Sequence, residues 1–314
     1  MGSSLSYYKD ILAEAPVSKN PDDYFEYPGH GPWFTCKPDG VMEPRCSKTG
    51  ISSASETPPS TLPELLKKAA ELKGDEPVMK VERPVPALGD DGKAPPALPD
   101  AEWTTWTYKQ YYNDAKTAAK AFIKLGFQPC DTVNVWGFNA PEWMLSSLAA
   151  NFAGGKVAGL YPTDTAQAAA YKVAHSGGSI IVVEEKKQLD RLIPALNARG
   201  DVAKVKALVA YGFEPAAGMT LDIAGCGTVP VKSWKEIMEL GSKESDEEVD
   251  ARTAAVKPGS CNALIYTSGT TGEPKAVMMS HDNMTFCAAA VIKSLQVSNN
   301  VANSTDQERG LSYL

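Results

Sequence analysis

The sequence is poor in the residues that build metal centres. Its 314 residues include three widely separated histidines (His30, His175 and His281) and six cysteines, none of which forms a Cys-x-x-Cys pair. Zinc sites need such pairs or a compact set of His and Cys ligands, so we predict no metal-binding cluster. A chain of this length needs no disulfide framework, and we interpret the cysteines as buried or free thiols in a reducing compartment.

Long apolar runs and an excess of positive charge are also absent from the sequence. No run approaches the ~18 apolar residues that a membrane-spanning helix requires. Lys and Arg number 31 against 38 Asp and Glu, a net charge of −7, which gives no reason to expect nucleic-acid binding. The chain does have enough apolar residues, 43%, for a sizeable core. We therefore predict a globular cytoplasmic protein.

The N-terminal region, residues 1–60, differs in character from the rest. It is rich in Pro, Gly, Ser and Asp and lacks sustained periodicity, which is typical of an irregular arm. Its first six residues fit the pattern for N-myristoylation at Gly2, with Ser6 at the required position; a polar leader or a cloning remnant is the alternative. One myristoyl chain binds membranes weakly and reversibly, so the pattern predicts peripheral membrane association if Gly2 is lipidated.

From residue 61 onward, strand and helix patterns alternate. A capped helix is expected after Thr61, and residues 89–100 form a loop between two strand-like runs. Strand–helix–strand order predicts an α/β fold of layered parallel sheets with flanking helices. The polar segment 241–258 is interpreted as a solvated helix or linker. The expected strands are 78–83, 103–108, 132–138, 156–161, 180–183, 205–211, 263–266 and 276–279, and the expected helices are 108–125, 141–153, 165–175 and 186–198.

The loop between the last two predicted strands is the most informative segment. Its glycines let the backbone approach a ligand closely, and its hydroxyls and successive N–H groups suit an anion. Lys275 supplies positive charge. The loop is not a Walker A motif, because Gly-Lys-Ser/Thr is absent and strands flank it on both sides; composition alone leaves a hairpin turn that binds nothing as the alternative. The candidate phosphate-binding residues are Thr267, Ser268, Gly269, Thr270, Thr271, Gly272, Glu273, Pro274 and Lys275.

Residues 266–275 (YTSGTTGEPK) closely resemble the signature of the adenylate-forming, AMP-binding superfamily, which includes acyl-CoA synthetases, luciferase-like enzymes and peptide-synthetase adenylation domains. The following residues 280–283 continue the resemblance, whereas Ala276 stands where a glycine is usual. Several upstream blocks are similar to the bubblegum-type long-chain acyl-CoA synthetases in particular. These blocks are 137–143 (GFNAPEW), 152–155 (FAGG), 159–163 (GLYPT) and 181–185 (IVVEE).

The resemblance implies a two-step ligase reaction that uses ATP, Mg²⁺ and coenzyme A. A long-chain fatty acid attacks the α-phosphorus of ATP to give acyl-AMP and pyrophosphate, and the thiol of coenzyme A then displaces AMP. The resemblance assigns phosphate binding to residues 267–272 and charge compensation to Lys275, with Thr267 and Lys275 as the catalytic candidates. It also implies that residues 61–314 are the N-terminal part of an adenylation domain.

Members of this family are considerably longer than 314 residues, and 308–314 resembles the approach to their next motif. The resemblance implies that the adenine, ribose and magnesium ligands lie beyond Leu314, so we expect the chain alone to be an inactive fragment. Two alternatives remain open: an incomplete relative that serves as a binding or structural module in a larger assembly, and a chain completed by a second polypeptide. Acyl chain length is not specified by these residues, and a luciferase-like or aryl-acid ligase is the alternative enzyme.

Overall fold

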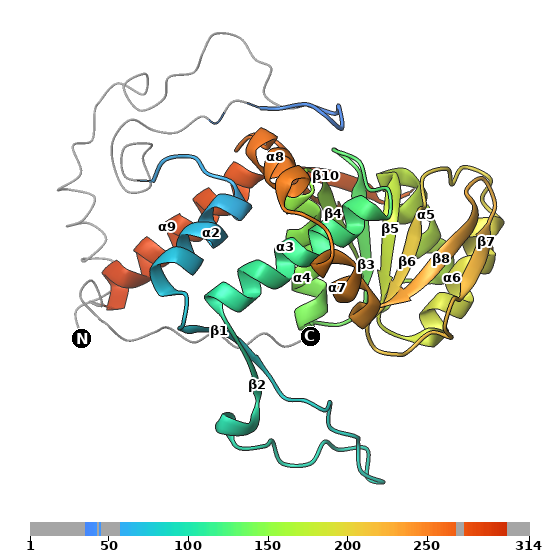
Figure 1. Cartoon of the computed structure of the whole chain (residues 1–314), viewed down its shortest axis with the longest axis horizontal. Coiled ribbons are helices and arrows are strands. Elements are labelled where there is room, and N and C mark those ends of the chain that lie inside the picture. The colour runs from blue at the N-terminus through green and yellow to red at the C-terminus, as the bar shows by residue number, and fades with distance from the viewer. Residues whose placement is uncertain (1–34, 43, 45–56, 268–272, 300–314) are drawn as a thin grey trace. The chain divides into compact units, whose positions relative to one another are not determined.

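A computed structural model describes most of the chain (Figure 1). The chain divides into two units: one from Met1–Thr61, Lys257–Ser260 and Ser280–Arg309, and a larger one from Leu62–Val256, Cys261–Met279 and Gly310–Leu314. Gly2 and most of the predicted arm lie outside the described residues, so the boundary at residue 60 stays a prediction. The structure describes residues 35–42, 44, 57–267 and 273–299.

The smaller unit contains helix α9 (His281–Asn299). Ser280 and Asn283 cap its start reciprocally: the Ser280 N–H donates to Asn283 Oδ1 (3.0 Å), and the Asn283 N–H donates to Ser280 Oγ (3.1 Å). Gly259 passes so close to Met42 that a Cβ at position 259 would lie 1.7 Å from the Met42 carbonyl oxygen. The segment resembling the family continuation, 280–283, is therefore a helix cap.

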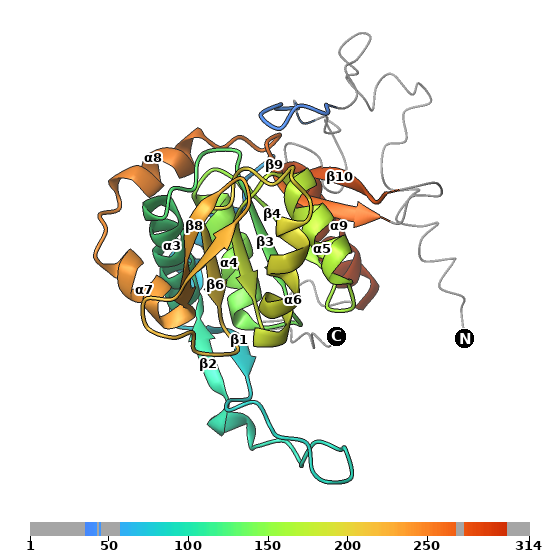
Figure 2. The ribbon, with the colours of Figure 1, turned by 90° about the vertical axis from the view of Figure 1, so that its right-hand side faces the viewer.

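The larger unit is built on an eight-stranded sheet with the order β10-β9-β4-β3-β5-β6-β8-β7 (Figure 2). In this order, each pair of neighbouring strands from β9 to β8 is parallel, and β7 pairs with β8 antiparallel. A seven-residue connection is too short for a parallel crossover, so β9 and β10 form an antiparallel hairpin. The strands are β3 (Thr132–Trp136), β4 (Lys156–Leu160), β5 (Gly178–Val183), β6 (Ala207–Ala210), β7 (Thr220–Ile223), β8 (Gly227–Ser233), β9 (Cys261–Thr267) and β10 (Lys275–Ser280).

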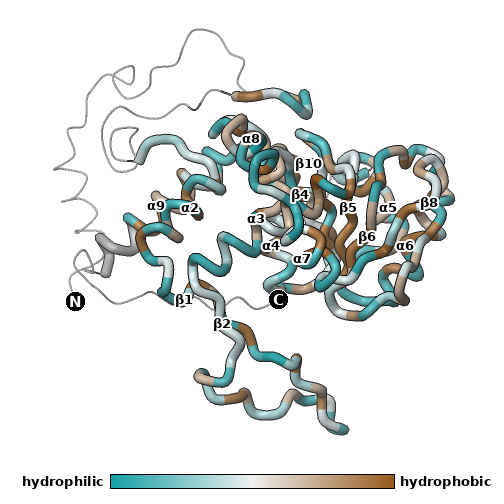
Figure 3. Tube along the Cα trace, viewed as in Figure 1, coloured by the Kyte–Doolittle hydropathy of each residue, from teal (hydrophilic) through white to brown (hydrophobic). Residues whose placement is uncertain are grey.

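Helices cover both faces of this sheet (Figure 2). The central strands are therefore apolar on both sides: in β5, Ile180 and Val182 join one core, and Ile181 and Val183 join the other. Figure 3 shows this as hydrophobic colour concentrated on the strands. Parallel strands buried on both faces give continuous apolar runs. One face carries α3 (Tyr108–Lys124), α4 (Pro141–Phe152), α7 (Trp234–Ser242) and α8 (Glu247–Ala255), with α2 (Leu62–Lys73) packed on α3; the other carries α5 (Ala166–Ser176) and α6 (Lys186–Asn197).

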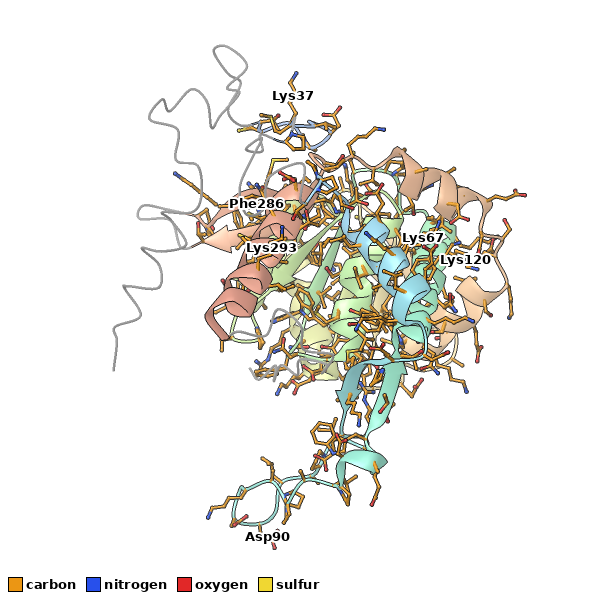
Figure 4. All side chains as sticks on the ribbon, turned by 90° about the vertical axis from the view of Figure 1, so that its left-hand side faces the viewer. Lys37, Lys67, Asp90, Lys120, Phe286 and Lys293 are labelled. Carbon is orange, nitrogen blue, oxygen red and sulfur yellow. The ribbon has the colours of Figure 1, made fainter. Side chains whose placement is uncertain are left out.

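A two-stranded ribbon stands apart from the main sheet. Strands β1 (Pro77–Val81) and β2 (Thr104–Thr107) pair antiparallel, and a short 3₁₀ helix, η2 (Asp100–Glu102), precedes β2. Their connection reaches away from the rest of the unit, with Asp90 near its tip (Figure 4). The predicted loop 89–100 is confirmed.

The predicted α/β fold is confirmed, and the boundaries of the predicted elements differ by at most two residues from the observed ones. The sequence patterns do not predict β7, β8, α7, α9 or the short η2. Of the two interpretations of segment 241–258, the solvated helix is confirmed and the linker is wrong: the segment contains the end of α7 and the whole of α8, which buries only Val249 in the core. Lys116 on α3 holds α8 by ion pairs to Asp246 (2.8 Å) and Asp250 (2.7 Å). Within the described part of the chain, every helix is too short or too polar to cross a membrane.

Gly241 allows α7 to pack closely on α3. A Cβ at this position would lie 1.9 Å from the Thr117 carbonyl oxygen, a backbone atom that cannot move away by itself. We expect Gly241→Ala to lower the free energy of unfolding by about 1–3 kcal/mol or more, as overpacking does, measured by urea denaturation. Gly89→Ala is the matched control, since a Cβ there meets only the Asp91 side chain and the Lys93 carbonyl oxygen at 3.1 Å or more. Equal stability of both variants would contradict this account.

Candidate functional site

The predicted phosphate-binding loop leaves the sheet at the carboxyl ends of the parallel strands. Strand β9 runs parallel to β4, and β4 runs parallel to β3, so these three strands end at the same edge. Strand β9 ends at Thr267, where the loop begins, and β10 starts at Lys275. Ligands of open α/β sheets bind outside this edge. The loop therefore lies at the edge of the sheet where open α/β proteins bind their ligands.

The order in which successive strands are added to the sheet also reverses at this point. Strand β4 lies on one side of β3, and β5, the next strand along the chain, lies on the other. Helix α4, which follows β3, packs on one face, whereas α5, which follows β4, packs on the opposite face. The connections after β3 and β4 therefore diverge, and such a switch point opens a crevice at the carboxyl edge. The loop follows β9, the neighbour of β4.

The two flanks of the loop meet at its base. The Thr267 hydroxyl donates to the Lys275 carbonyl oxygen over 3.5 Å, a long hydrogen bond. Thr267, Glu273 and Lys275 have exposed side chains, and Pro274 is half-buried. The structure thus brings together the two catalytic candidates, Thr267 and Lys275. Ser268, Gly269, Thr270, Thr271 and Gly272 lie outside the described residues, and their phosphate-binding role stays a prediction.

Helix α5 binds both flanks of the loop through tyrosine hydroxyls. Before the loop, Tyr266 donates to the Lys172 carbonyl oxygen (3.1 Å); after it, Tyr171 donates to the Pro274 carbonyl oxygen (3.0 Å). Burial raises the pKa of Tyr266 well above its usual range, so its proton is retained. His175 Nδ1 lies within hydrogen-bond distance of the same hydroxyl, at 3.0 Å.

A buried cation lies beneath this arrangement. The Lys172 side chain is 3% exposed, and its Nζ is 2.5 Å from Asp164 Oδ2. The ammonium also lies over two aromatic rings, 4.7 Å from the centroid of Tyr161 and 5.6 Å from that of Tyr266. Asp164 additionally accepts the Tyr161 N–H (2.8 Å). The connection after β4 is thereby fixed to both α5 and β9.

Arg199 contacts Tyr171 of α5. Its guanidinium carbon lies 5.4 Å from the centroid of Tyr171. The Asp201 carboxylate, which accepts its hydrogen bonds, raises the pKa of Arg199, and the negative charge of Glu273 adds to this effect. Glu273, the one acid among residues 267–275, is therefore attracted by a cation outside the loop.

The sequence patterns assign no role to the residues that support the loop. The segment 165–175 predicts only a helix, and Tyr161 belongs only to a family block. One signal was present: Tyr171 and Lys172 interrupt a run of small apolar residues in that helix. A tyrosine and a lysine at core-facing positions need polar partners, and such partners mark a structured polar site.

Metal ligands are not gathered in this part of the molecule. Among the residues that the structure describes, no group of three or more His, Cys, Asp or Glu side chains could hold a metal ion. Two acids of the surrounding polar group are engaged in ion pairs, Asp164 with Lys172 and Asp201 with Arg199. No described residue is therefore assigned to Mg²⁺.

Comparison with known proteins connects this geometry to a family. A model of the family described as AMP-binding enzyme matches residues 90–314. The chain belongs to the AMP-binding enzyme family. The match includes β3 to β10, α5 and the whole loop, so every residue of the candidate site lies within the AMP-binding segment.

The relatives of this chain include the bubblegum type that the sequence blocks indicated. The chain is 34% identical over 282 residues to the long-chain-fatty-acid–CoA ligase ACSBG2 of Xenopus laevis, which covers 90% of this chain and 33% of that protein. It is 39% identical over 186 residues to ACSBG1 of Bos taurus, which covers 59% of this chain and 24% of that protein. The chain thus spans about a third or less of the length of these relatives.

Solved structures confirm that the fold is that of the N-terminal portion of adenylate-forming enzymes. A long-chain-fatty-acid–CoA ligase (FadD1) from Archaeoglobus fulgidus superposes with a TM-score of 0.54 at 19% identity, covering 77% of this chain and 40% of that one. The adenylation domain of a carboxylate reductase from Mycobacterium chelonae gives 0.53 at 20% identity, covering 74% and 36%. At these identities the likeness concerns the fold alone.

Proposed function

We propose that the chain takes part in the ATP-dependent activation of a long-chain fatty acid to acyl-AMP and then to acyl-CoA. The observation that carries the proposal is the loop 267–275, which leaves the carboxyl edge of the parallel sheet with an exposed lysine at its base. Its family supports nucleotide use. Relatives at about a third identity are named long-chain-fatty-acid–CoA ligases, which supports the fatty acid as substrate.

The chemistry of the first step suits the residues at the loop base. A carboxylate oxygen of the acid forms a bond to the α-phosphorus while the bond from that phosphorus to the bridging oxygen breaks, and pyrophosphate leaves with the electron pair. Such phosphoryl-centre chemistry depends mainly on positioning and charge stabilisation. The ammonium of Lys275 would compensate negative charge on the triphosphate. The chain as a whole cannot do so, because its net charge is −7.

Thr267 is proposed as a hydroxyl donor to the same phosphates. Its present bond to the Lys275 carbonyl oxygen is long, 3.5 Å, and can be exchanged for a shorter bond to an anionic oxygen. Backbone N–H groups of residues 268–272 are proposed to contribute as well. Mg²⁺ would neutralise part of the triphosphate charge, but the described residues offer it no acidic cluster, so no protein ligand is proposed. Coenzyme A enters only as the acceptor of the second step.

The proposal is tested by acid-dependent ATP–pyrophosphate exchange on the purified chain and on any longer product of the same gene. We expect the longer product to exchange with palmitate and not without acid, and the chain alone to show no exchange. Benzoate distinguishes the alternative enzyme: exchange with benzoate but not with palmitate would indicate an aryl-acid ligase. Tight ATP binding with no exchange from either protein would contradict the ligase and favour a nucleotide-binding module.

A further inference from the structure

The geometry points to Tyr171 as a positioning residue that sets the C-terminal flank of the nucleotide-binding loop, an inference that rests on the proposed function. Tyr171 lies on α5, and its hydroxyl donates to the Pro274 carbonyl oxygen (3.0 Å). Pro274 immediately precedes Lys275. The hydroxyl therefore fixes the peptide group from which the proposed phosphate-binding lysine begins.

Pro274 makes this contact specific. Proline has no backbone N–H and its φ is fixed, so its carbonyl is its sole backbone hydrogen-bonding group. A donor to that carbonyl thus determines the orientation of the peptide plane between Pro274 and Lys275. The Tyr171 hydroxyl is the side-chain donor that reaches it from α5.

The Tyr171 ring packs against two neighbours. His175, one helical turn further on α5, stacks on it with ring centroids 5.4 Å apart and planes at 22°. The Arg199 guanidinium lies 5.4 Å from its centroid. A ring clamped in this way loses little further freedom when its hydroxyl binds. Tyr171 can therefore impose its position on the loop.

Arg199 adds an electrostatic component at the same flank. Glu273 would repel the phosphates of a nucleotide if its carboxylate faced them. Arg199, next to Tyr171, carries the opposite charge, and the charge of Glu273 acts on it. Tyr171 thus holds the carbonyl of Pro274, and the positive charge of Arg199 acts at the same flank.

Tyr171→Phe removes the hydroxyl and keeps the clamped ring. Without the tether, binding must order the flank, so we expect the dissociation constant for Mg-ATP to rise about 3- to 10-fold, the effect of one neutral hydrogen bond. Isothermal titration calorimetry on the chain, with circular dichroism to verify folding, provides the measurement. Tyr211→Phe is the matched control, because its hydroxyl also donates to a backbone carbonyl, that of Phe138 (3.4 Å), away from the β9–β10 hairpin.

The outcomes separate this inference from the proposed function. Weaker binding by Tyr171→Phe, with Tyr211→Phe like the unmodified chain, supports the positioning role. Equal affinities of both variants and the unmodified chain overturn it and leave the proposed function standing. Failure of both the unmodified, folded chain and any longer product of the same gene to bind Mg-ATP overturns the nucleotide site and this inference together. If Tyr171→Phe does not fold, Arg199→Gln tests the same flank, with an expected two- to five-fold loss that shrinks at high salt.

Discussion

Replacing Lys275 by alanine is expected to lower acid-dependent ATP–pyrophosphate exchange by roughly 10²-fold, the usual effect of removing one preorganised charge-stabilising donor. Lys275 is exposed at the first position of β10, and it is the one cation among residues 267–275 of a chain with net charge −7. Its removal leaves Glu273 as the only formal charge of the loop. The comparison is made by initial exchange rates at saturating ATP and palmitate.

Two companion variants sharpen this test. Lys235→Ala removes an exposed lysine from α7, far along the sequence from the loop, and should leave the exchange rate unchanged. Lys275→Arg keeps the charge but alters its shape, so partial activity is expected. A rate that falls equally in Lys275→Ala and Lys235→Ala would assign the effect to net charge and would contradict a specific role for Lys275.

Asp164→Ala is expected to destabilise the fold by about 3–5 kcal/mol, because it leaves the ammonium of Lys172 buried without its carboxylate. The Lys172 side chain is 3% exposed and that of Asp164 13%, and their charged atoms are 2.5 Å apart. The rings of Tyr161 and Tyr266 attract the cation but cannot accept its hydrogen bonds as a carboxylate does. The free energy of unfolding from urea titration measures the loss.

Lys172→Met provides the opposite deletion within the same pair. It removes the buried charge and keeps an apolar stem, and Asp164 retains its bond from the Tyr161 N–H, so we expect a smaller loss than for Asp164→Ala. Asp190→Ala, which breaks the exposed Lys186–Asp190 pair on α6, should cost less than about 1 kcal/mol. Losses of similar size for Asp164→Ala and Asp190→Ala would show that the rings alone stabilise Lys172.

The central sheet was predictable because its signal is local. Residues 180–183 are consecutive apolar residues, which indicates a strand buried on both faces, and in the structure all of β5 is buried. Strands β7 and β8 gave no such signal: Thr220 and Asp222 are exposed, and Pro230 lies within β8. Proline in a strand argues against that assignment. The edge of the sheet was therefore missed where the sequence pattern is mixed.

The candidate site was predictable only in its loop. Thr267 and Lys275 are identified by residue type and by a motif that is continuous in the sequence. Tyr171 and Lys172 lie roughly a hundred positions before the loop, and periodicity describes only neighbours within one element. Their contacts arise because the chain crosses from β4 through α5 and later returns to place β9 beside β4. That return is a property of topology, which the local pattern does not encode.

The late return of β9 also has a consequence for how the protein is made. Strands β3 to β6 find their neighbours within short crossovers, whereas Val157 and Ala158 pair with Ala263 and Leu264, roughly a hundred positions later. Domains are synthesised and begin to fold from the N-terminus. On the ribosome, the central strands can assemble before the strand that carries the loop has emerged. A nucleotide bound at the proposed site therefore cannot guide the early assembly of this sheet; it can only stabilise a sheet already completed by its late-arriving strand.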